Sequence, residues 1–199
     1  MFIKKIIEKC IKKKDRFQND FMTKLSIKIM HKNIFIKKGN FIQKTAFINK
    51  GKIEIDDNFS IGYKIGGGFK GAFSEIQTRE KQAIIKIGRN FCTNNGIFLC
   101  ANKKIEIGDD VLVGKNVTIM DHNGHGISPE FRRNYGGTTK EIIIENNVWI
   151  GSGAYILPGT KIGYNSIVGA GAIVKGEYPP NCIIQGNPAQ IVRYIVEER

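Results

Sequence analysis

The sequence predicts an all-β fold in which the chain winds into a parallel β-helix, and two observations in its C-terminal half predict it. Aliphatic side chains recur at every sixth position without a break, namely Ile144, Ile150, Ile156, Ile162, Val168 and Val174. Four positions after the first five of these comes a valine or a small side chain, namely Val148, Ala154, Thr160, Ser166 and Ala172. A period of six fits neither an α-helix nor a continuous strand, but it fits short straight segments separated by corners.

Three such straight segments close one triangular coil of a hexapeptide-repeat β-helix. Each inward-pointing aliphatic residue should then stack on its counterpart in the next coil, for example Ile144 on Ile162. Glycines follow three of the aliphatic positions directly, at Gly151, Gly163 and Gly169, where a corner has no room for a bulky side chain. The same register is recognisable earlier in the chain, from about Ile53 onward.

The length of 199 residues predicts one domain with appendages. We expect a basic, helical N-terminal segment and cap (1–40) and a β-helix domain (41–178) that carries a loop over 120–143. A closing segment (179–199), expected as a short strand or helix, ends the chain. The register is also lost from Gly66 to Gln82, which predicts a bulging loop there.

The N-terminal segment carries much of the net charge of +13, because residues 1–40 hold twelve Lys and Arg against three acidic residues. Residues 2–14 place isoleucines at helical spacing among lysines, which predicts a basic amphipathic helix, and residues 26–29 alternate like a strand. The helix either caps the solenoid, as the stronger expectation, or contacts an anionic membrane or an anionic glycan. Nucleic acid is disfavoured because aromatic residues spaced for base stacking are missing.

No apolar run is long enough to span a membrane, and lysines interrupt the N-terminus too often for a signal-peptide core. We therefore expect a cytoplasmic protein, located at the inner face of the membrane if the basic segment binds there. The four cysteines have no paired spacing, so they predict free thiols rather than disulfides or a zinc site.

The chemistry is expected where the regular pattern stops, in the 25 residues between Ile119 and Ile144. Two of the three histidines in the chain, His122 and His125, lie at the start of this loop. A histidine at the mouth of a loop is well placed as a general base, oriented either by Asp121 or by a backbone carbonyl. The third histidine, His31, is remote in sequence, so three histidine ligands at coil spacing are missing and no metal is predicted.

Four blocks carry a resemblance to a known family: Asn147–Ser152, Ile156–Gly163, Val168–Val174 and Gly186–Ala189. The chain resembles the hexapeptide-repeat acyltransferases, which fold as left-handed parallel β-helices, over roughly Ile53 to Arg193. It is most similar to the sugar O-acetyltransferase branch, which includes galactoside and maltose acetyltransferases and enzymes that decorate surface polysaccharides.

This resemblance implies a homotrimer with acetyl-coenzyme A in a groove between subunits, and a saccharide acceptor. It implies that His122 is the catalytic base and that the acceptor hydroxyl attacks the thioester directly. The implied coenzyme contacts are Trp149, Ser152, Ala170, Lys175 and Arg193. The implied acceptor contacts are Asn94, Asn95, Asp121 and His125. The chain departs from the family at Lys175, a cation shifted by one residue, and at Gln190, where a basic residue is common.

The function expected on these grounds is acetylation of a sugar hydroxyl, on a capsule, an O-antigen or another surface polysaccharide or its precursor. Three alternatives remain open. The first is an acetyltransferase that modifies antibiotics of the streptogramin or chloramphenicol kind. The second is N-acetylation of an amino sugar, and the third, without catalysis, is a structural β-solenoid.

Overall fold

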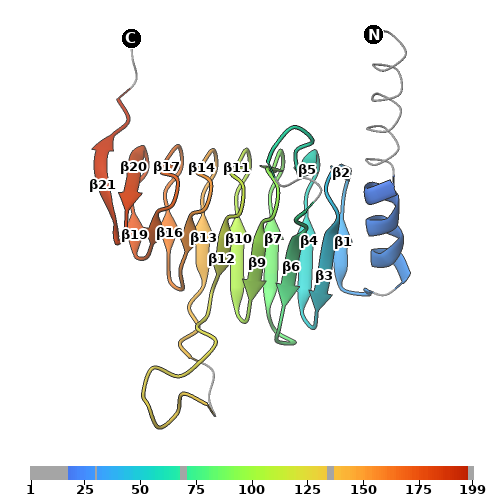
Figure 1. The fold of residues 1–199 in the computed structure, drawn as a ribbon, viewed down its shortest axis with the longest axis horizontal. Coiled ribbons are helices and arrows are strands. Elements are labelled where there is room, and N and C mark those ends of the chain that lie inside the picture. The colour runs from blue at the N-terminus through green and yellow to red at the C-terminus, as the bar shows by residue number, and fades with distance from the viewer. Residues whose placement is uncertain (1–17, 30, 68–70, 134–136, 197–199) are drawn as a thin grey trace.

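The computed structural model of the chain describes residues 18–29, 31–67, 71–133 and 137–196. Figure 1 shows a stack of coils from the side, with a helix at one end, a C-terminal strand at the other, and one long loop that projects from an edge. The coils form a left-handed parallel β-helix, as the sequence predicted.

Each coil contributes one strand to each of three parallel sheets. Sheet A contains β1 (Ile34–Ile36), β4 (Lys52–Ile55), β7 (Ile84–Ile87), β10 (Lys104–Ile107), β13 (Ile142–Ile144), β16 (Lys161–Ile162) and β19 (Glu177–Tyr178). Sheet B contains β2 (Gly39–Phe41), β5 (Phe59–Ile61), β8 (Cys92–Thr93), β11 (Leu112–Val113), β14 (Trp149–Ile150), β17 (Ile167–Val168), β20 (Cys182–Gly186) and β21 (Ala189–Tyr194). Sheet C contains β3 (Thr45–Asn49), β6 (Ser74–Thr78), β9 (Phe98–Ala101), β12 (Thr118–Met120), β15 (Tyr155–Ile156) and β18 (Ile173–Val174). We name the corners by the sheets that they join: A–B, B–C and C–A.

The predicted stacking register is confirmed. Ile144 lies beside Ile162, and Ile150 lies beside Val168. All six aliphatic residues of the repeat are at most 1% exposed. The small residues between them, from Ala154 to Ala172, are also buried, at the corners of the triangle. Burying one such aliphatic side chain contributes about 1.5–3 kcal/mol, so a continuous aliphatic column stabilises the whole stack.

The A–B corner repeats one local conformation from coil to coil. Its corner residues have positive φ angles between 56° and 62° and are Asn58, Asn90, Asp110, Asn147, Asn165 and Asn181. Asparagine and aspartate tolerate this left-handed conformation better than other side chains do. Their side chains also bond from coil to coil; for example, Asn165 Nδ2 donates to Asn181 Oδ1 at 3.0 Å. This asparagine ladder makes the corner a regular edge.

The N-terminal end of the coils is covered by a helix over residues 18–29 (Figure 1). Asp20 Oδ1 accepts a hydrogen bond from Phe41 N (2.9 Å), and Lys24 Nζ donates to Gly39 O (2.8 Å), so the helix holds the edge strand β2. The prediction of extended chain at 26–29 was wrong. Residues 26–29 alone fit helical spacing and strand alternation equally well. Thr23 and Ile27, which are one helical turn apart, are both buried, so packing against the coils favours the helix. The predicted helix over 2–14 lies outside the described residues.

Two boundaries differ from the expectation. The β-helix begins at Ile34 rather than at residue 41. The predicted loop over 66–82 contains the strand β6, whose Ile76 is buried and pairs with Leu99, so the excursion occupies residues 62–73. The strand was hidden because its inward positions include the polar Ser74 and Thr78. Thr78 Oγ1 accepts a hydrogen bond from Gly51 N inside the coil.

The C-terminal end is closed by a change of strand direction. Strand β20 continues sheet B in parallel with β17, and β21 then pairs with β20 in the antiparallel sense. The closing segment is therefore a strand, which covers the edge that the last coil would expose. Cys92, Cys100 and Cys182 are free thiols. Among the described residues, no helix is long and apolar enough to cross a membrane.

Candidate functional site

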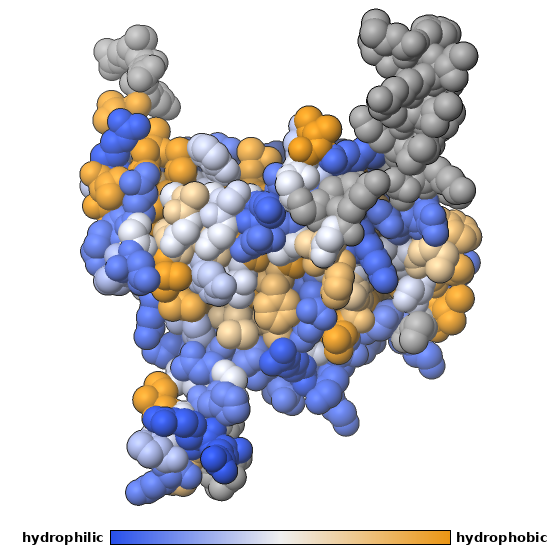
Figure 2. Space-filling view, viewed as in Figure 1, coloured by the Kyte–Doolittle hydropathy of each residue, from blue (hydrophilic) through white to orange (hydrophobic). Residues whose placement is uncertain are grey.

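The long loop leaves the solenoid at the C–A corner, between β12 and β13, and is hydrophilic over most of its visible surface (Figures 1 and 2). Backbone hydrogen bonds close its neck. Asn123 N donates to Thr138 O at 3.0 Å and Gly137 N donates to Asn123 O at 3.1 Å. His122 forms a single antiparallel bridge with Thr139. The loop is therefore attached rigidly at its root.

Asp121 is the anchor of this root and is completely buried. Its carboxylate accepts hydrogen bonds from the backbone N–H groups of Asn102, Lys103 and Lys104, each at 2.7 Å. The same carboxylate lies 3.0 Å from His122 Nδ1. Charge-assisted bonds of this kind are among the strong ones in proteins, so Asp121 joins the loop root to the turn of the preceding coil.

His122 is held between two charged groups and is only 2% exposed. Its Nδ1 faces the Asp121 carboxylate, and its Nε2 lies 3.5 Å from Nη1 of Arg79. A carboxylate only accepts and a guanidinium only donates, so Nδ1 carries the proton and the lone pair of Nε2 faces Arg79. Both ring nitrogens of His122 are thereby engaged inside the protein.

His125, three residues further on, is exposed on the loop. Its Nδ1 lies 3.0 Å from the backbone oxygen of Arg132, which can only accept, so Nδ1 carries the proton and Nε2 carries the lone pair. In the described part of the chain, Nε2 has no recorded partner. Arg132 Nη2 in turn donates to Ile127 O (3.3 Å), which folds the loop around this histidine. His125 thus presents a basic nitrogen to the outside.

Two residues of this corner were not found from the sequence, Arg79 and Asn102. They follow β6 and β9 at the position that His122 takes after β12, so the three residues stack along one edge of the solenoid. Asn102 Oδ1 is buried and has no hydrogen-bond partner among the described residues. An alignment of β6, β9 and β12 would have identified both residues, but the sequence prediction assigned β6 to a loop.

A nearby thiol, Cys100, is unsuited to catalysis. It is completely buried on β9, and burial raises its pKa to about 11. Its Sγ donates to Gln77 Oε1 at 3.7 Å, and the same oxygen accepts a hydrogen bond from Arg79 Nε at 3.1 Å. A protonated, inaccessible thiol is a poor nucleophile, so this cluster is not built for an acyl-cysteine intermediate.

The predicted coenzyme contacts Ser152 and Ala170 lie together at the B–C corner, in successive coils, and both are exposed. Gly171 N donates to Ser152 O at 2.9 Å, which fixes the two turns against each other. A Cβ atom added at Gly171 would meet nothing within 4 Å. Small side chains in this register form a smooth edge along which an extended chain has room to lie.

The other predicted coenzyme contacts lie elsewhere in the chain. Trp149 is 53% exposed on the outer face of sheet B, between Leu112 and Ile167. Lys175 follows β18 and is therefore at the C–A corner. Arg193 is exposed on β21, opposite Ile183. Within one chain the structure groups Ser152 with Ala170 but does not bring Lys175 beside them.

The predicted acceptor contacts Asn94 and Asn95 lie at the B–C corner, not at the C–A corner with the histidines. Asn95 is completely buried. Its Nδ2 donates to Tyr63 O and its Oδ1 accepts from Tyr63 N, both at 2.8 Å. Asn94 Oδ1 accepts a hydrogen bond from Asn95 N (2.8 Å). Asn95 therefore anchors the 62–73 excursion, which leaves its amide no free group for an acceptor.

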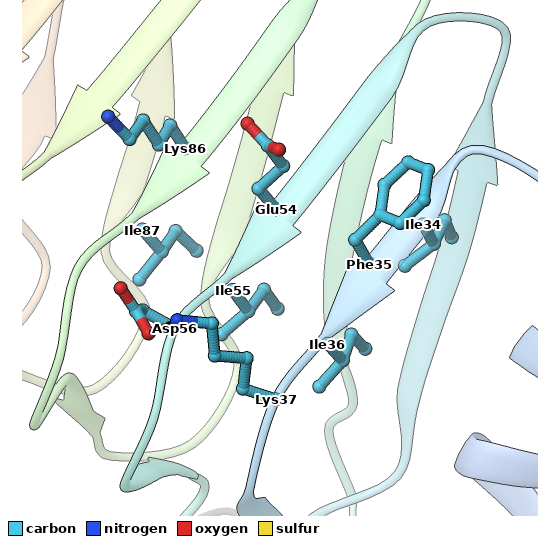
Figure 3. Close-up of a pocket in the computed structure, with 9 residues that line it drawn as sticks. All are labelled: Ile34, Phe35, Ile36, Lys37, Glu54, Ile55, Asp56, Lys86 and Ile87. Carbon is cyan, nitrogen blue, oxygen red and sulfur yellow. Dashed lines mark ion pairs between the residues drawn. The ribbon is translucent and has the colours of Figure 1, made fainter.

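A hollow of about 500 Å³ lies on sheet A, away from these corners (Figure 3). Its charged groups largely neutralise each other, since Lys37 Nζ lies 2.8 Å from Asp56 Oδ1. The isoleucines at its base belong to the core, so the hollow offers little catalytic chemistry. Among the described residues, no group of three or more His, Cys, Asp or Glu side chains is placed to bind a metal.

Comparisons with known proteins agree with this architecture. The profile "Bacterial transferase hexapeptide (six repeats)" matches residues 141–176, and "Hexapeptide repeat of succinyl-transferase" matches residues 104–128. Galactoside O-acetyltransferase from Escherichia coli (strain K12) is 43% identical over 111 residues, which are 56% of this chain and 54% of that protein. The chain thus spans about half the length of this curated relative.

Two further similarities extend over more of the chain. A putative lipopolysaccharide biosynthesis O-acetyl transferase of Escherichia coli (strain K12) is 29% identical over 173 residues, 80% of this chain and 81% of that one. The solved structure of a galactoside acetyltransferase in complex with coenzyme A covers 93% of this chain and 82% of its own, with 26% identity and a TM-score of 0.55.

Fold and corner geometry define the class of protein as a hexapeptide-repeat solenoid with one long loop at an edge. The chain carries the hexapeptide repeats of bacterial transferases over residues 104–128 and 141–176, and its relatives include the sugar O-acetyltransferases expected from the sequence motifs.

Proposed function

We propose that the protein is an acetyl-coenzyme A-dependent O-acetyltransferase that modifies a sugar hydroxyl. The hexapeptide repeats and the similarity to galactoside O-acetyltransferase support the reaction class. The observation that carries the proposal is an exposed histidine, His125, whose Nδ1 proton is held by a backbone carbonyl so that Nε2 is available as a base.

The base that we propose is His125 rather than His122, the residue that the resemblance to the hexapeptide-repeat acyltransferases implied. A general base must come within hydrogen-bond distance of the hydroxyl from which it takes the proton. His122 is buried and its Nε2 faces a guanidinium, whereas His125 is exposed and its Nε2 makes no hydrogen bond to any residue that the structure describes. In this proposal Asp121 and His122 hold the root of the loop, and the loop positions His125.

The proposed reaction is a direct transfer. His125 Nε2 accepts the proton of the acceptor hydroxyl while the hydroxyl oxygen attacks the thioester carbonyl. The new C–O bond forms, the C–S bond breaks, and the proton passes from the imidazolium to the departing thiolate of coenzyme A. General-base assistance of this type contributes about 10²–10⁴ in rate.

We further infer that the site is completed by a neighbouring copy of the chain. Ser152 and Ala170 lie at the B–C corner and His125 belongs to the C–A corner, so a full strand of sheet C separates them. Six residues of extended chain span roughly 20 Å, whereas the reacting atoms must approach to about 3–3.5 Å. A homotrimer in which the B–C corner of one copy faces the C–A corner of the next would bring the two together.

In this arrangement the pantetheine arm lies along Ser152 and Ala170, with Trp149 near it and Lys175 and Arg193 contributing positive charge toward the coenzyme phosphates. Asn102, whose buried amide oxygen has no hydrogen-bond partner in the described part of the chain, lies one coil from His122 and is oriented by the same turn that Asp121 holds. The acceptor is proposed to be a surface polysaccharide or its precursor, because one relative over 80% of the chain bears the name of a lipopolysaccharide biosynthesis O-acetyl transferase.

The test is the release of free coenzyme A from acetyl-coenzyme A in the presence of nucleotide sugars, lipid-linked glycans, intact polysaccharides, chloramphenicol and amino sugars. We expect release with a sugar hydroxyl acceptor and a product that is stable as an O-ester. Coenzyme A should also raise the unfolding temperature by binding the native state. If coenzyme A were not released with any acceptor and did not raise the unfolding temperature, the proposal would be contradicted. If transfer occurred only to an amine, the reaction would be N-acetylation rather than O-acetylation.

A further inference from the structure

The C–A corner carries a row of lysines that the catalytic residues do not use. Lys50, Lys81, Lys103 and Lys140 lie in the turns that lead into β4, β7, β10 and β13, one in each successive coil. All four are exposed. We call these four residues the lysine row. It reaches the root of the loop that carries His125.

The lysines of the row differ from those of the adjacent sheet in their charge partners. On sheet A, Lys52 Nζ lies 2.6 Å from Glu54, Lys161 Nζ lies 3.0 Å from Glu177, and Lys104 also pairs with a glutamate. No lysine of the row forms an ion pair with any described residue. The nearest acidic residues in sequence, Glu80 and Glu141, form no ion pair with the row either. The row therefore carries positive charge that no ion pair among the described residues neutralises.

The geometry of a β-helix gives the lysine row a fixed spacing. Strands of neighbouring coils lie about 4.8 Å apart, so the step from Lys50 to the corner at His122 covers roughly 15 Å along the axis. Like charges held this close repel one another within a Debye length of about 8–10 Å, and a bound chain of anions would remove the repulsion. Arg132 and Arg133 extend the positive charge into the loop itself.

We propose that the lysine row binds an acidic acceptor glycan, whose carboxylates lie along the C–A corner while one of its hydroxyls reaches the histidines of the loop. This inference rests on the proposed transferase function and specifies the substrate class of the same site. A glycan fits better than an anionic membrane because the row is one residue wide. The long loop also projects beyond the same edge of the solenoid, which would keep a flat bilayer away from the lysines (Figure 1).

The test compares two triple variants with the same change in net charge. The first, Lys50→Gln, Lys81→Gln and Lys103→Gln, removes most of the row. The control, Lys52→Gln, Lys86→Gln and Lys161→Gln, removes three exposed lysines on sheet A. The probes are an oligomer of galacturonate, a maltose oligomer of equal length as the neutral counterpart, and vesicles of phosphatidylserine and phosphatidylcholine.

Binding is measured without coenzyme, so that failure of catalysis and failure of this inference are separate results. We expect the row variant to bind the galacturonate oligomer about tenfold more weakly, with a shallower dependence on salt, while the control variant and the maltose oligomer show no change. Equal affinity of the row variant and the wild type would overturn the proposal. So would a loss confined to vesicle binding, which would assign the row to a membrane. If binding behaves as expected but no sugar is acetylated, the proposed reaction fails and the binding surface stands.

Discussion

The A–B and C–A corners of this solenoid turn the same chain between neighbouring strands, yet they are stabilised differently. The A–B corner repeats an asparagine or aspartate with positive φ in coil after coil, bonded to its counterpart above and below. The described residues of the C–A corner show no such repeat. Its central coil is held by one buried carboxylate, Asp121, which accepts three backbone hydrogen bonds and contacts a buried histidine.

This difference shows how a repetitive fold accommodates a functional site. At the A–B corner every coil contributes a small, equal amount of stability, so no single residue is decisive. At the C–A corner the long loop interrupts the repeat, and the buried carboxylate of Asp121 takes the place of the coil-to-coil hydrogen bonds found at the A–B corner. The substitutions below should therefore have unequal effects at the two corners.

The largest effect on stability is expected for Asp121→Ala. The change leaves three backbone N–H groups and the Nδ1–H of His122 without their acceptor inside the protein, which should lower the free energy of unfolding by about 3–5 kcal/mol. Denaturant unfolding measures it. The matched control at the A–B corner is Asp57→Ala, which removes a half-exposed carboxylate and should cost less than about 1 kcal/mol. Similar losses for the two variants would show that Asp121 is not a special anchor.

A moderate effect is expected for Asn165→Ala at the A–B corner. Alanine at φ of 58° is strained by about 1–2 kcal/mol, and the variant also loses the bond to Asn181. Asn165→Gly loses the same bond without the steric strain, so it should be less destabilising than alanine. Denaturant unfolding of the two variants measures the difference. If both lost the same free energy of unfolding, the positive φ of this corner would not be the reason that asparagine occupies it.

The smallest effect is expected for Arg89→Gln, at the exposed end of the same corner. Arg89 Nη2 donates to Asp109 Oδ2 at 2.6 Å, and this hydrogen bond holds the pKa of Asp109 below its usual value. A depressed carboxyl pKa stabilises the native state above the unfolded-state pKa of about 4, and this contribution is lost as the pH falls through the native-state pKa. The variant should therefore unfold slightly more easily than wild type at neutral pH and equally near pH 2. If the variant were less stable than wild type by the same amount at neutral pH and near pH 2, the pKa of Asp109 would not be the cause.

The regular part of the molecule could be predicted because its signal is local and repeated. The six-residue spacing from Ile144 to Val174 identifies the inward positions, and all of them are buried as expected. Strand β6 was missed because Ser74 and Thr78 occupy inward positions that other coils fill with hydrophobic residues. The helix over 18–29 was missed at its C-terminal end because four residues are too few to separate a helical from an alternating pattern.

The site was predictable only in part. The sequence located the loop and its two histidines, but it could not show which imidazole is enclosed. That depends on Arg79, which is distant in sequence and reaches His122 only through the stacking of coils. In the same way, the sequence could not show that the side-chain amide of Asn95 is hydrogen-bonded to the backbone of Tyr63 and is therefore not free to contact an acceptor. The residue type indicates which chemistry a side chain can perform, and the contacts between coils determine whether that side chain is accessible to a substrate.

The central claim, that His125 is the base and His122 supports the loop, is tested most directly by kcat for two variants. His125→Ala should lower kcat by about 10²–10⁴ while coenzyme A still raises the unfolding temperature as in wild type. His122→Gln, which keeps a donor for Asp121, should retain kcat to within about tenfold, with a lower unfolding temperature. A near-normal kcat for His125→Ala, together with loss of turnover in folded His122→Gln, would contradict the account and restore His122 as the base.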